Sequence, residues 1–255
     1  MIPLKDNIPT ERTPWVTIAL IAINVFVYFV LEKGGILSGP GNAVVIDWGA
    51  IPYEITHPGQ QCDVIQAAIG PAIGCGHIPG SHPPTILTIF SSMFMHGSIL
   101  HLAGNMLFLW IFGNNVEDSM GPVRFIVFYL LGGLAADAGQ ILFSVNSTVP
   151  SIGASGAVAG VLGGYLLLFP RARVVTLVFI IFFFTILELP AILFLGIWII
   201  QQALFAYFDL LQPAGSEGGV AYFAHIGGFV FGLLLIRVFA SERRRRRQLD
   251  RAGMT

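Results

Sequence analysis

The sequence predicts an all-α fold: a polytopic membrane protein with a bundle of six transmembrane helices and a long first loop on the outer side. Hydrophobic residues make up 55% of the chain and charged residues only 11%, and the mean hydropathy is +0.78. A soluble domain carries about 25% charged residues. The apolar residues are also gathered into stretches of about 20 residues, which is the length that a bilayer requires.

The expected helices follow one another along the chain. Apolar stretches predict spans at Trp15–Leu31 and at residues 89–112, 123–143, 155–169, 189–208 and 220–240. Residues 174–187 form a seventh, shorter stretch. A seventh crossing would place the arginine block of residues 243–247 outside, against the positive-inside rule. We therefore interpret residues 174–187 as a re-entrant or interfacial segment that leads into the fifth helix.

The distribution of charge predicts the orientation, although the net charge is only -1. We expect residues 1–14 to be a cytosolic N-terminus, residues 15–240 the membrane domain and residues 241–255 a cytosolic arginine-rich tail. Residues 34–85 contain no lysine or arginine and form the extracytoplasmic loop. We interpret the tail as a topology anchor that attracts anionic lipid, with no nucleic-acid partner. The expected location is a bacterial plasma membrane.

Two short motifs within the apolar spans predict chemistry. Gly153-Ala154-Ser155-Gly156 opens the fourth span, and Ala224-His225 lies in the first third of the sixth. A serine and a histidine are the minimum parts of a nucleophile and its general base. The second, fourth and sixth spans run in the same direction, so Ser155 and His225 should lie at similar depth. His101 and Asn105 are one helical turn apart in the second span and should face the same site.

These residues also have purely structural interpretations. A serine in a transmembrane helix commonly bonds its own backbone, and a histidine can join two helices. Small residues at four-residue spacing let helices pack closely. This spacing occurs at Gly156, Gly160 and Gly164, and at Gly228 and Gly232. Close packing of the fourth and sixth helices would itself bring Ser155 and His225 together.

In combination, His96-x4-His101-x3-Asn105 on the second helix, Gly153-Ala154-Ser155-Gly156 and Ala224-His225-x-x-Gly228 resemble the rhomboid intramembrane serine proteases. The likeness extends from about residue 48 to residue 240. It implies a dyad without a carboxylate, in which Ser155 is the nucleophile and His225 the base. It also implies an oxyanion hole formed by His101, Asn105 and the Ser155 amide, with structural support from His96, Gly153, Gly156 and Gly228. The implied substrates are single-pass transmembrane proteins cut near the outer face, and no cofactor or metal is expected.

The chain departs from the best-studied bacterial pattern at two places. Leu87 and Thr88 stand where a Trp-Arg pair is common, so the first loop must be held differently. Ala159 replaces an aromatic residue that stacks on the base in some members, and we expect Tyr222 or Phe223 to orient the base instead. Asp137 is an acid within an apolar span, which we expect to cap a helix or to pair with Gln140 rather than to complete a triad.

The outer loop contains both cysteines, Cys62 and Cys75. Outside the cytosol, two such residues favour a disulfide. His57, His77 and His82 lie in the same loop and permit a metal site, but their spacing fits no common zinc pattern. We therefore expect the disulfide.

The function predicted from these residues is that of a six-helix membrane serine endopeptidase. One alternative is a catalytically inactive relative that binds or chaperones transmembrane clients. Retention of both Ser155 and His225 argues against it, because a pure binder needs neither. A second alternative is a small-molecule transporter, which the absence of a visible inverted repeat with paired broken helices disfavours.

Overall fold

The computed structural model describes residues 1–67, 70–77, 82–180, 183–211 and 220–254. Parts of the expected outer loop, residues 68–69 and 78–81, and Thr255 of the tail lie outside this description. The described chain is mostly helical, which confirms the predicted fold class.

The helices of the first half are α1 (Trp15–Phe26), η1 (Val27–Leu31), α2 (Asn42–Trp48), α3 (Pro52–Thr56), α4 (Thr85–Ser92), α5 (Ile99–Phe108), η2 (Leu109–Gly113) and α6 (Asn114–Met120). Those of the second half are α7 (Pro122–Phe143), α8 (Ser155–Leu168), α9 (Ala191–Leu210), α10 (Tyr222–Phe239) and α11 (Glu242–Arg251). The strands are β1 (Ile2–Asp6), β2 (Gln61–Ala67), β3 (Gly70–Gly76), β4 (Arg173–Ile180) and β5 (Phe183–Pro190).

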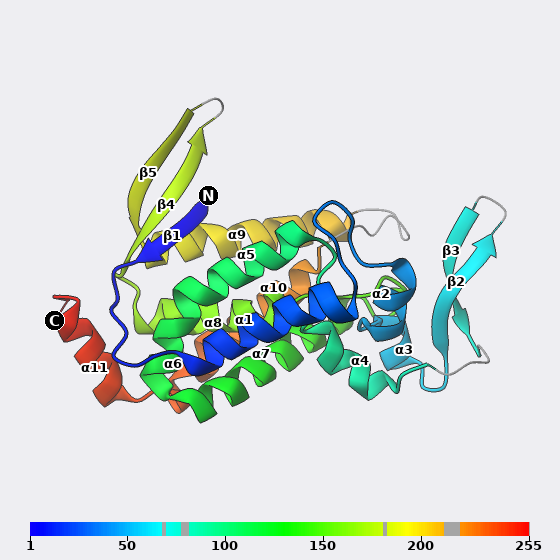
Figure 1. Ribbon diagram of the computed structural model, residues 1–255, viewed down its shortest axis with the longest axis horizontal. Coiled ribbons are helices and arrows are strands. Elements are labelled where there is room, and N and C mark those ends of the chain that lie inside the picture. The colour runs from blue at the N-terminus through cyan, green and yellow to red at the C-terminus, as the bar shows by residue number, and fades with distance from the viewer. Residues whose placement is uncertain (68–69, 78–81, 181–182, 212–219, 255) are drawn as a thin grey trace.

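Six apolar helical segments match the predicted spans in order. Four are long and apolar enough to cross a membrane: Ile99–Met120, Pro122–Phe143, Ala191–Leu210 and Tyr222–Phe239. Trp15–Leu31 and Ser155–Leu168 are shorter. The segments run roughly parallel, with β1 and α11 at one end of the bundle and α2, α3 and the β2–β3 hairpin at the other (Figure 1). These segments are those of an integral membrane protein.

The second span differs from its prediction. Residues 89–112 were expected to form one helix, but α4 ends at Ser92 and α5 begins only at Ile99, from where the helix continues to Met120. The break has a local cause at Ser98, whose backbone is extended and whose side chain accepts a hydrogen bond from the His101 amide at 3.2 Å. A serine N-cap of this kind starts a helix even within an apolar sequence. His96 therefore lies in the turn before the helix and not on it.

The described part of the seventh apolar stretch, residues 174–180 and 183–187, forms neither a helix nor a simple loop; residues 181–182 lie outside the described residues. Both parts lie in the antiparallel strands β4 and β5, and β1 pairs with β4 to complete a sheet of order β1-β4-β5. The stretch is rich in valine, isoleucine, threonine and phenylalanine, which favour strands. The hairpin projects sideways from the bundle beside the beginning of α9 (Figure 1). Its position relative to the bilayer stays a prediction.

The outer loop is held against the bundle by backbone hydrogen bonds to the segment before α8. Ala50 and Ser151 exchange two such bonds of 3.0 and 2.8 Å. The Tyr53 amide donates to the Ser147 carbonyl at 3.0 Å. Both contacts brace the segment that leads into α8.

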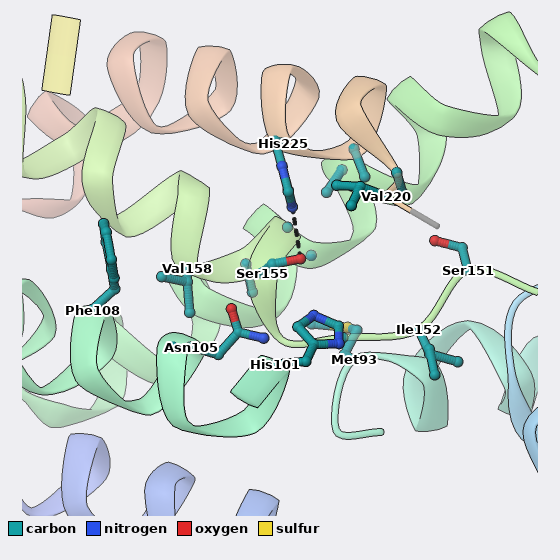
Figure 2. Close-up of a pocket in the computed structure, with 18 of the residues that line it drawn as sticks. Met93, His101, Asn105, Phe108, Ser151, Ile152, Ser155, Val158, Val220 and His225 are labelled. Carbon is teal, nitrogen blue, oxygen red and sulfur yellow. Dashed lines mark hydrogen bonds between the residues drawn. The ribbon is translucent and has the colours of Figure 1, made fainter. Parts of the chain in front are cut away.

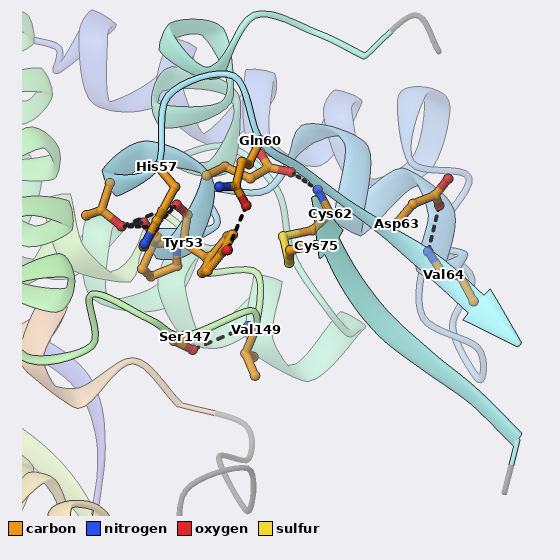
Figure 3. The surroundings of a disulfide bond; sticks show 12 residues. Tyr53, His57, Gln60, Cys62, Asp63, Val64, Cys75, Ser147 and Val149 are labelled. Carbon is orange, nitrogen blue, oxygen red and sulfur yellow. Dashed lines mark hydrogen bonds between the residues drawn. A yellow bond between two sulfur atoms is a disulfide. The ribbon is translucent and has the colours of Figure 1, made fainter. Parts of the chain in front are cut away.

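The β2–β3 hairpin carries the two cysteines on opposite strands, and Cys62 and Cys75 are joined by a disulfide (Figure 3). The Cys62 side chain is buried beside Ile46 and Ile51. The Cys62 amide donates to the Glu54 carboxylate at 2.7 Å, which ties the hairpin to α3. Burial raises the pKa of Glu54, and this hydrogen bond opposes the increase.

The loop histidines have separate surroundings. The His57 ring stacks on Tyr53 with centroids 4.1 Å apart, and His82 lies 3.5 Å from the Asp47 carboxylate. Within the described residues, no group of three or more histidine, cysteine or acidic side chains is arranged to hold a metal.

Replacing both cysteines with serine should lower the melting temperature of the purified protein. The bridged residues are separated by 13 positions in sequence, for which the chain-entropy model gives about 3 kcal/mol of stabilisation. Thermal unfolding of oxidised protein in detergent measures the effect. A reductant should lower the melting temperature of the natural protein toward that of the double variant and leave the variant unchanged; equal melting temperatures for the two oxidised proteins would contradict the prediction.

Candidate active site

Ser155 is the first residue of α8 and lies within the bundle. The chain enters α8 through Gly153, whose φ of +132° is strained for residues with a side chain. The Gly153 amide donates to the Ser92 carbonyl at 2.8 Å, which fixes this turn to the end of α4. At the first position of a helix, the Ser155 amide has no acceptor within that helix. The Ser155 amide is therefore available to a ligand.

His225 comes from the first turn of α10, 70 residues further along the chain. Its Nε2 atom lies 2.8 Å from the Ser155 Oγ atom (Figure 2). This distance is ideal for a hydroxyl that donates to an imidazole nitrogen. The pair thus has the geometry that a nucleophile and a general base require.

The contact between Ser155 and His225 depends on close approach of α8 and α10. A Cβ atom at Gly228 would overlap the Gly156 carbonyl oxygen, and one at Gly232 would overlap the Gly160 carbonyl oxygen. On its other side, a Cβ atom at Gly156 would lie 2.5 Å from the Ala136 Cβ of α7. The glycines therefore have a structural role that the dyad requires: they allow the close contact of α8 and α10 that brings Ser155 and His225 together.

His101 and Asn105 approach Ser155 from α5. The site that a Cβ atom would occupy at Gly153 is 2.9 Å from His101 Nε2 and 3.4 Å from Ser155 Oγ. The Asn105 Nδ2 atom is buried and has no hydrogen-bond partner among the described residues. Figure 2 shows His225 on one side of Ser155, with His101 and Asn105 on the other. Two side-chain donors and a helix N-terminus thus converge on one space.

His96 lies behind His101 and is fully buried. The two imidazole rings meet edge to face, with centroids 5.1 Å apart. The His96 amide donates to both oxygens of Glu32, at 3.2 and 3.1 Å, and so joins this turn to the end of the first span. His96 is placed to support His101 and does not reach Ser155 directly.

The ring of His225 has one aromatic neighbour that was expected, Tyr222, and one that was not, Trp198. Trp198 of α9 is 5.8 Å away between centroids and tilted by 38°, and Tyr222 meets the ring edge-on at 6.5 Å. Phe223 stacks instead on Phe143 at 4.4 Å. Of the two expected candidates, Tyr222 is therefore a neighbour of the ring and Phe223 is not. The expectation missed Trp198, because the packing of the fifth helix against the sixth is not visible in a linear sequence.

Gln202 of α9 is a second residue that the sequence reasoning missed. Its Oε1 atom lies 2.8 Å from His225 Nδ1, and the residue is only 7% exposed. A signal was present, since Gln201 and Gln202 interrupt an otherwise apolar span and polar residues in such spans are functional candidates.

Asp137 lines the same cavity as the dyad but does not pair with Gln140 as expected. Gln140 donates to Ser144 Oγ at 3.2 Å and accepts from the Ala224 amide at 3.3 Å. The Asp137 Oδ2 atom has no partner among the described residues.

Ser155 and His225 face a cavity of about 580 Å³. Its walls include Ser155, His225, His101 and Asn105, together with apolar residues such as Val158 and Trp198. A mostly apolar cavity with a few convergent polar groups is the usual form of a binding or catalytic site.

The family model and the similar proteins all indicate the same family. The family model for the rhomboid domain matches residues 83–242, which is more than half of the chain. The mitochondrial rhomboid protein 1 of Saccharomyces cerevisiae is 32% identical over 173 residues, which is 66% of this chain and 46% of that protein. The rhomboid protease GluP of Bacillus subtilis is 29% identical over 153 residues, 60% of this chain and 24% of that protein.

A third relative is the mitochondrial presenilin-associated rhomboid-like protein of Mus musculus, 30% identical over 150 residues, which is 57% of this chain and 36% of that protein. The chain thus spans less than half the length of each of these three relatives. Two of the three are mitochondrial, so they do not support the expected bacterial plasma membrane over other membranes.

Proposed function

The chain belongs to the rhomboid family, and from that premise we propose that it is a serine endopeptidase acting on single-pass transmembrane proteins within the membrane. The observation that carries the proposal is the 2.8 Å contact between Ser155 Oγ and His225 Nε2. This contact joins two helices inside an apolar bundle, next to Asn105 Nδ2, which has no hydrogen-bond partner among the described residues.

The proposed reaction is acyl transfer in two steps. Ser155 Oγ attacks the scissile carbonyl carbon while His225 Nε2 takes the hydroxyl proton, and the carbonyl oxygen becomes an oxyanion. Asn105 Nδ2, His101 and the Ser155 amide lie around the same space and would stabilise this oxyanion. His225 then returns the proton to the leaving amine, and an acyl-serine remains. Attack by water, with the same proton exchange, releases the acid and restores the serine.

Substrate selection follows from the position of the site. The dyad lies at the beginning of the short α8, and the segment before α8 is bonded to Ala50 and Tyr53 of the loop that carries α2 and α3. A peptide bond must leave its helix to reach Ser155, because helical amides and carbonyls are bonded to each other. We therefore expect cleavage near the outer face, at a weak point of a substrate helix, with both termini of this chain in the cytosol.

The direct test is incubation of the purified protein in detergent with a single-pass model substrate, with the cut located by mass spectrometry. A fluorophosphonate should label Ser155, and His225→Ala should abolish the labelling. Binding of the substrate without any cut would contradict this proposal and favour a catalytically inactive binder. Labelling spread over several serines would also contradict it.

Replacing Asn105 with alanine should lower kcat about a hundredfold to a thousandfold with little change in KM. The reason is that Asn105 Nδ2 gains its acceptor only when the oxyanion forms. The exposed Asn146→Ala is the matched control and should cleave normally. A change in KM alone would place Asn105 in substrate binding and contradict its proposed role.

A further inference from the structure

Both ring nitrogens of His225 have a partner, and the second partner has no assigned role. Nε2 lies 2.8 Å from Ser155 Oγ, and Nδ1 lies 2.8 Å from Gln202 Oε1. Gln202 belongs to α9, which contributes no reacting group, and its side chain is almost completely buried. A buried amide normally requires such a partner, so the contact is a fixed part of the site.

The orientation of the Gln202 amide is set by its own helix. Its Nε2 atom donates to the Trp198 carbonyl, one turn earlier, at 3.4 Å. The carbonyl end of the amide therefore faces His225 Nδ1. A carbonyl oxygen only accepts, so the hydrogen of a neutral imidazole must reside on Nδ1.

This arrangement selects the productive tautomer. With hydrogen on Nδ1, the Nε2 lone pair is free to accept the Ser155 proton. In the other tautomer, the Nδ1 lone pair would face the Gln202 oxygen, and Nε2 would carry a hydrogen toward Ser155. Trp198 lies tilted against the ring and Tyr222 meets it edge-on, but a ring contact does not distinguish the two tautomers.

We propose that Gln202 is a positioning residue for the base: its side-chain carbonyl holds His225 in the tautomer with hydrogen on Nδ1, as the neutral counterpart of a triad carboxylate. The inference rests on the proposed protease function for its kinetic consequence. It also explains how the dyad is oriented although Ala159 stands where some members carry an aromatic residue. The fifth helix thus takes part in the reaction through the sixth.

The chain offers a matched pair of variants, because Gln201 is exposed and Gln202 buried on the same helix. Gln202→Met keeps the length of the side chain and removes the acceptor. It should lower kcat roughly tenfold to a hundredfold, as a partial loss of general-base catalysis, with KM and melting temperature near their natural values. Gln201→Met should behave like the natural protein.

Gln202→Glu supplies the conservative rescue. It restores an acceptor opposite Nδ1 and should recover cleavage relative to Gln202→Met. Its negative charge should also move the acidic limb of the kcat profile to higher pH, because a nearby carboxylate favours the imidazolium. The other titratable side chains on the cavity wall, His101 and Asp137, are unchanged in all variants, so they do not cause a difference between them.

A measurement independent of cleavage separates this inference from the function itself. ¹⁵N spectra of the six histidines, with His225 assigned by its loss in His225→Ala, should show hydrogen on Nδ1 in the natural protein and a tautomer mixture in Gln202→Met. An unchanged tautomer in Gln202→Met, or full activity of that variant, would overturn the inference. The proposed function would still stand if cleavage required Ser155. If the protein showed no cleavage that requires Ser155, the proposed function itself would be wrong.

Discussion

Ser155→Ala and His225→Ala should each reduce cleavage of a transmembrane substrate by a factor of roughly 10⁴ or more. Ser155 Oγ supplies the bond to the carbonyl carbon, and His225 Nε2, 2.8 Å away, is its hydrogen-bonded base. Because the two groups act as one unit, the double variant should be hardly slower than either single variant. Cleavage rates with a mapped cut site measure all three.

The control for this experiment is folding. The Ser155 and His225 side chains line a cavity, so the variants should retain melting temperatures close to that of the natural protein. Undiminished cleavage by Ser155→Ala would show that another group attacks the substrate, and the serine-protease proposal would then be wrong. A double variant much slower than the singles would show that the two side chains act separately.

The parts of this fold that the sequence predicts are those set by long-range composition. Each of the six spans is an apolar stretch, so their order, and the approximate bounds of all but the second, follow from hydropathy alone. The convergence of Ser155 and His225 follows from the direction of the spans, since alternate helices run the same way. Both deductions need only the hydropathy and the order of the segments along the chain.

What the sequence does not predict depends on local competition or on tertiary packing. The break before Ile99 is decided by the cap at Ser98, within a run of apolar residues that also suits a continuous helix. Residues 174–187 are apolar and short, and periodicity does not separate a strand from a helix in such a run. Gln202 acts on His225 only because α9 packs against α10, which no spacing in the sequence states.

Gly228→Val should remove both stability and activity, because it acts on the contact between α8 and α10. A Cβ atom at Gly228 would overlap the Gly156 carbonyl oxygen, and this atom is backbone, so no side chain can move away to make room. The helices must separate, and overpacking of this kind typically costs about 1–3 kcal/mol. Separation of the helices also moves His225 away from Ser155. His225 lies one turn before Gly228 on α10, and Ser155 directly precedes Gly156 on α8.

The matched control is Gly196→Val on α9, where a Cβ atom would meet nothing within 4 Å. Thermal unfolding in detergent and fluorophosphonate labelling of Ser155 measure the two effects. We expect a lower melting temperature and no labelling for Gly228→Val, and natural values of both for Gly196→Val. An unchanged melting temperature together with normal labelling for Gly228→Val would mean that α8 and α10 do not touch through their backbones, and the geometry on which the dyad depends would then be wrong. Loss of labelling without loss of stability would instead assign Gly228 to orienting His225 alone, since only the local position of the base would have changed.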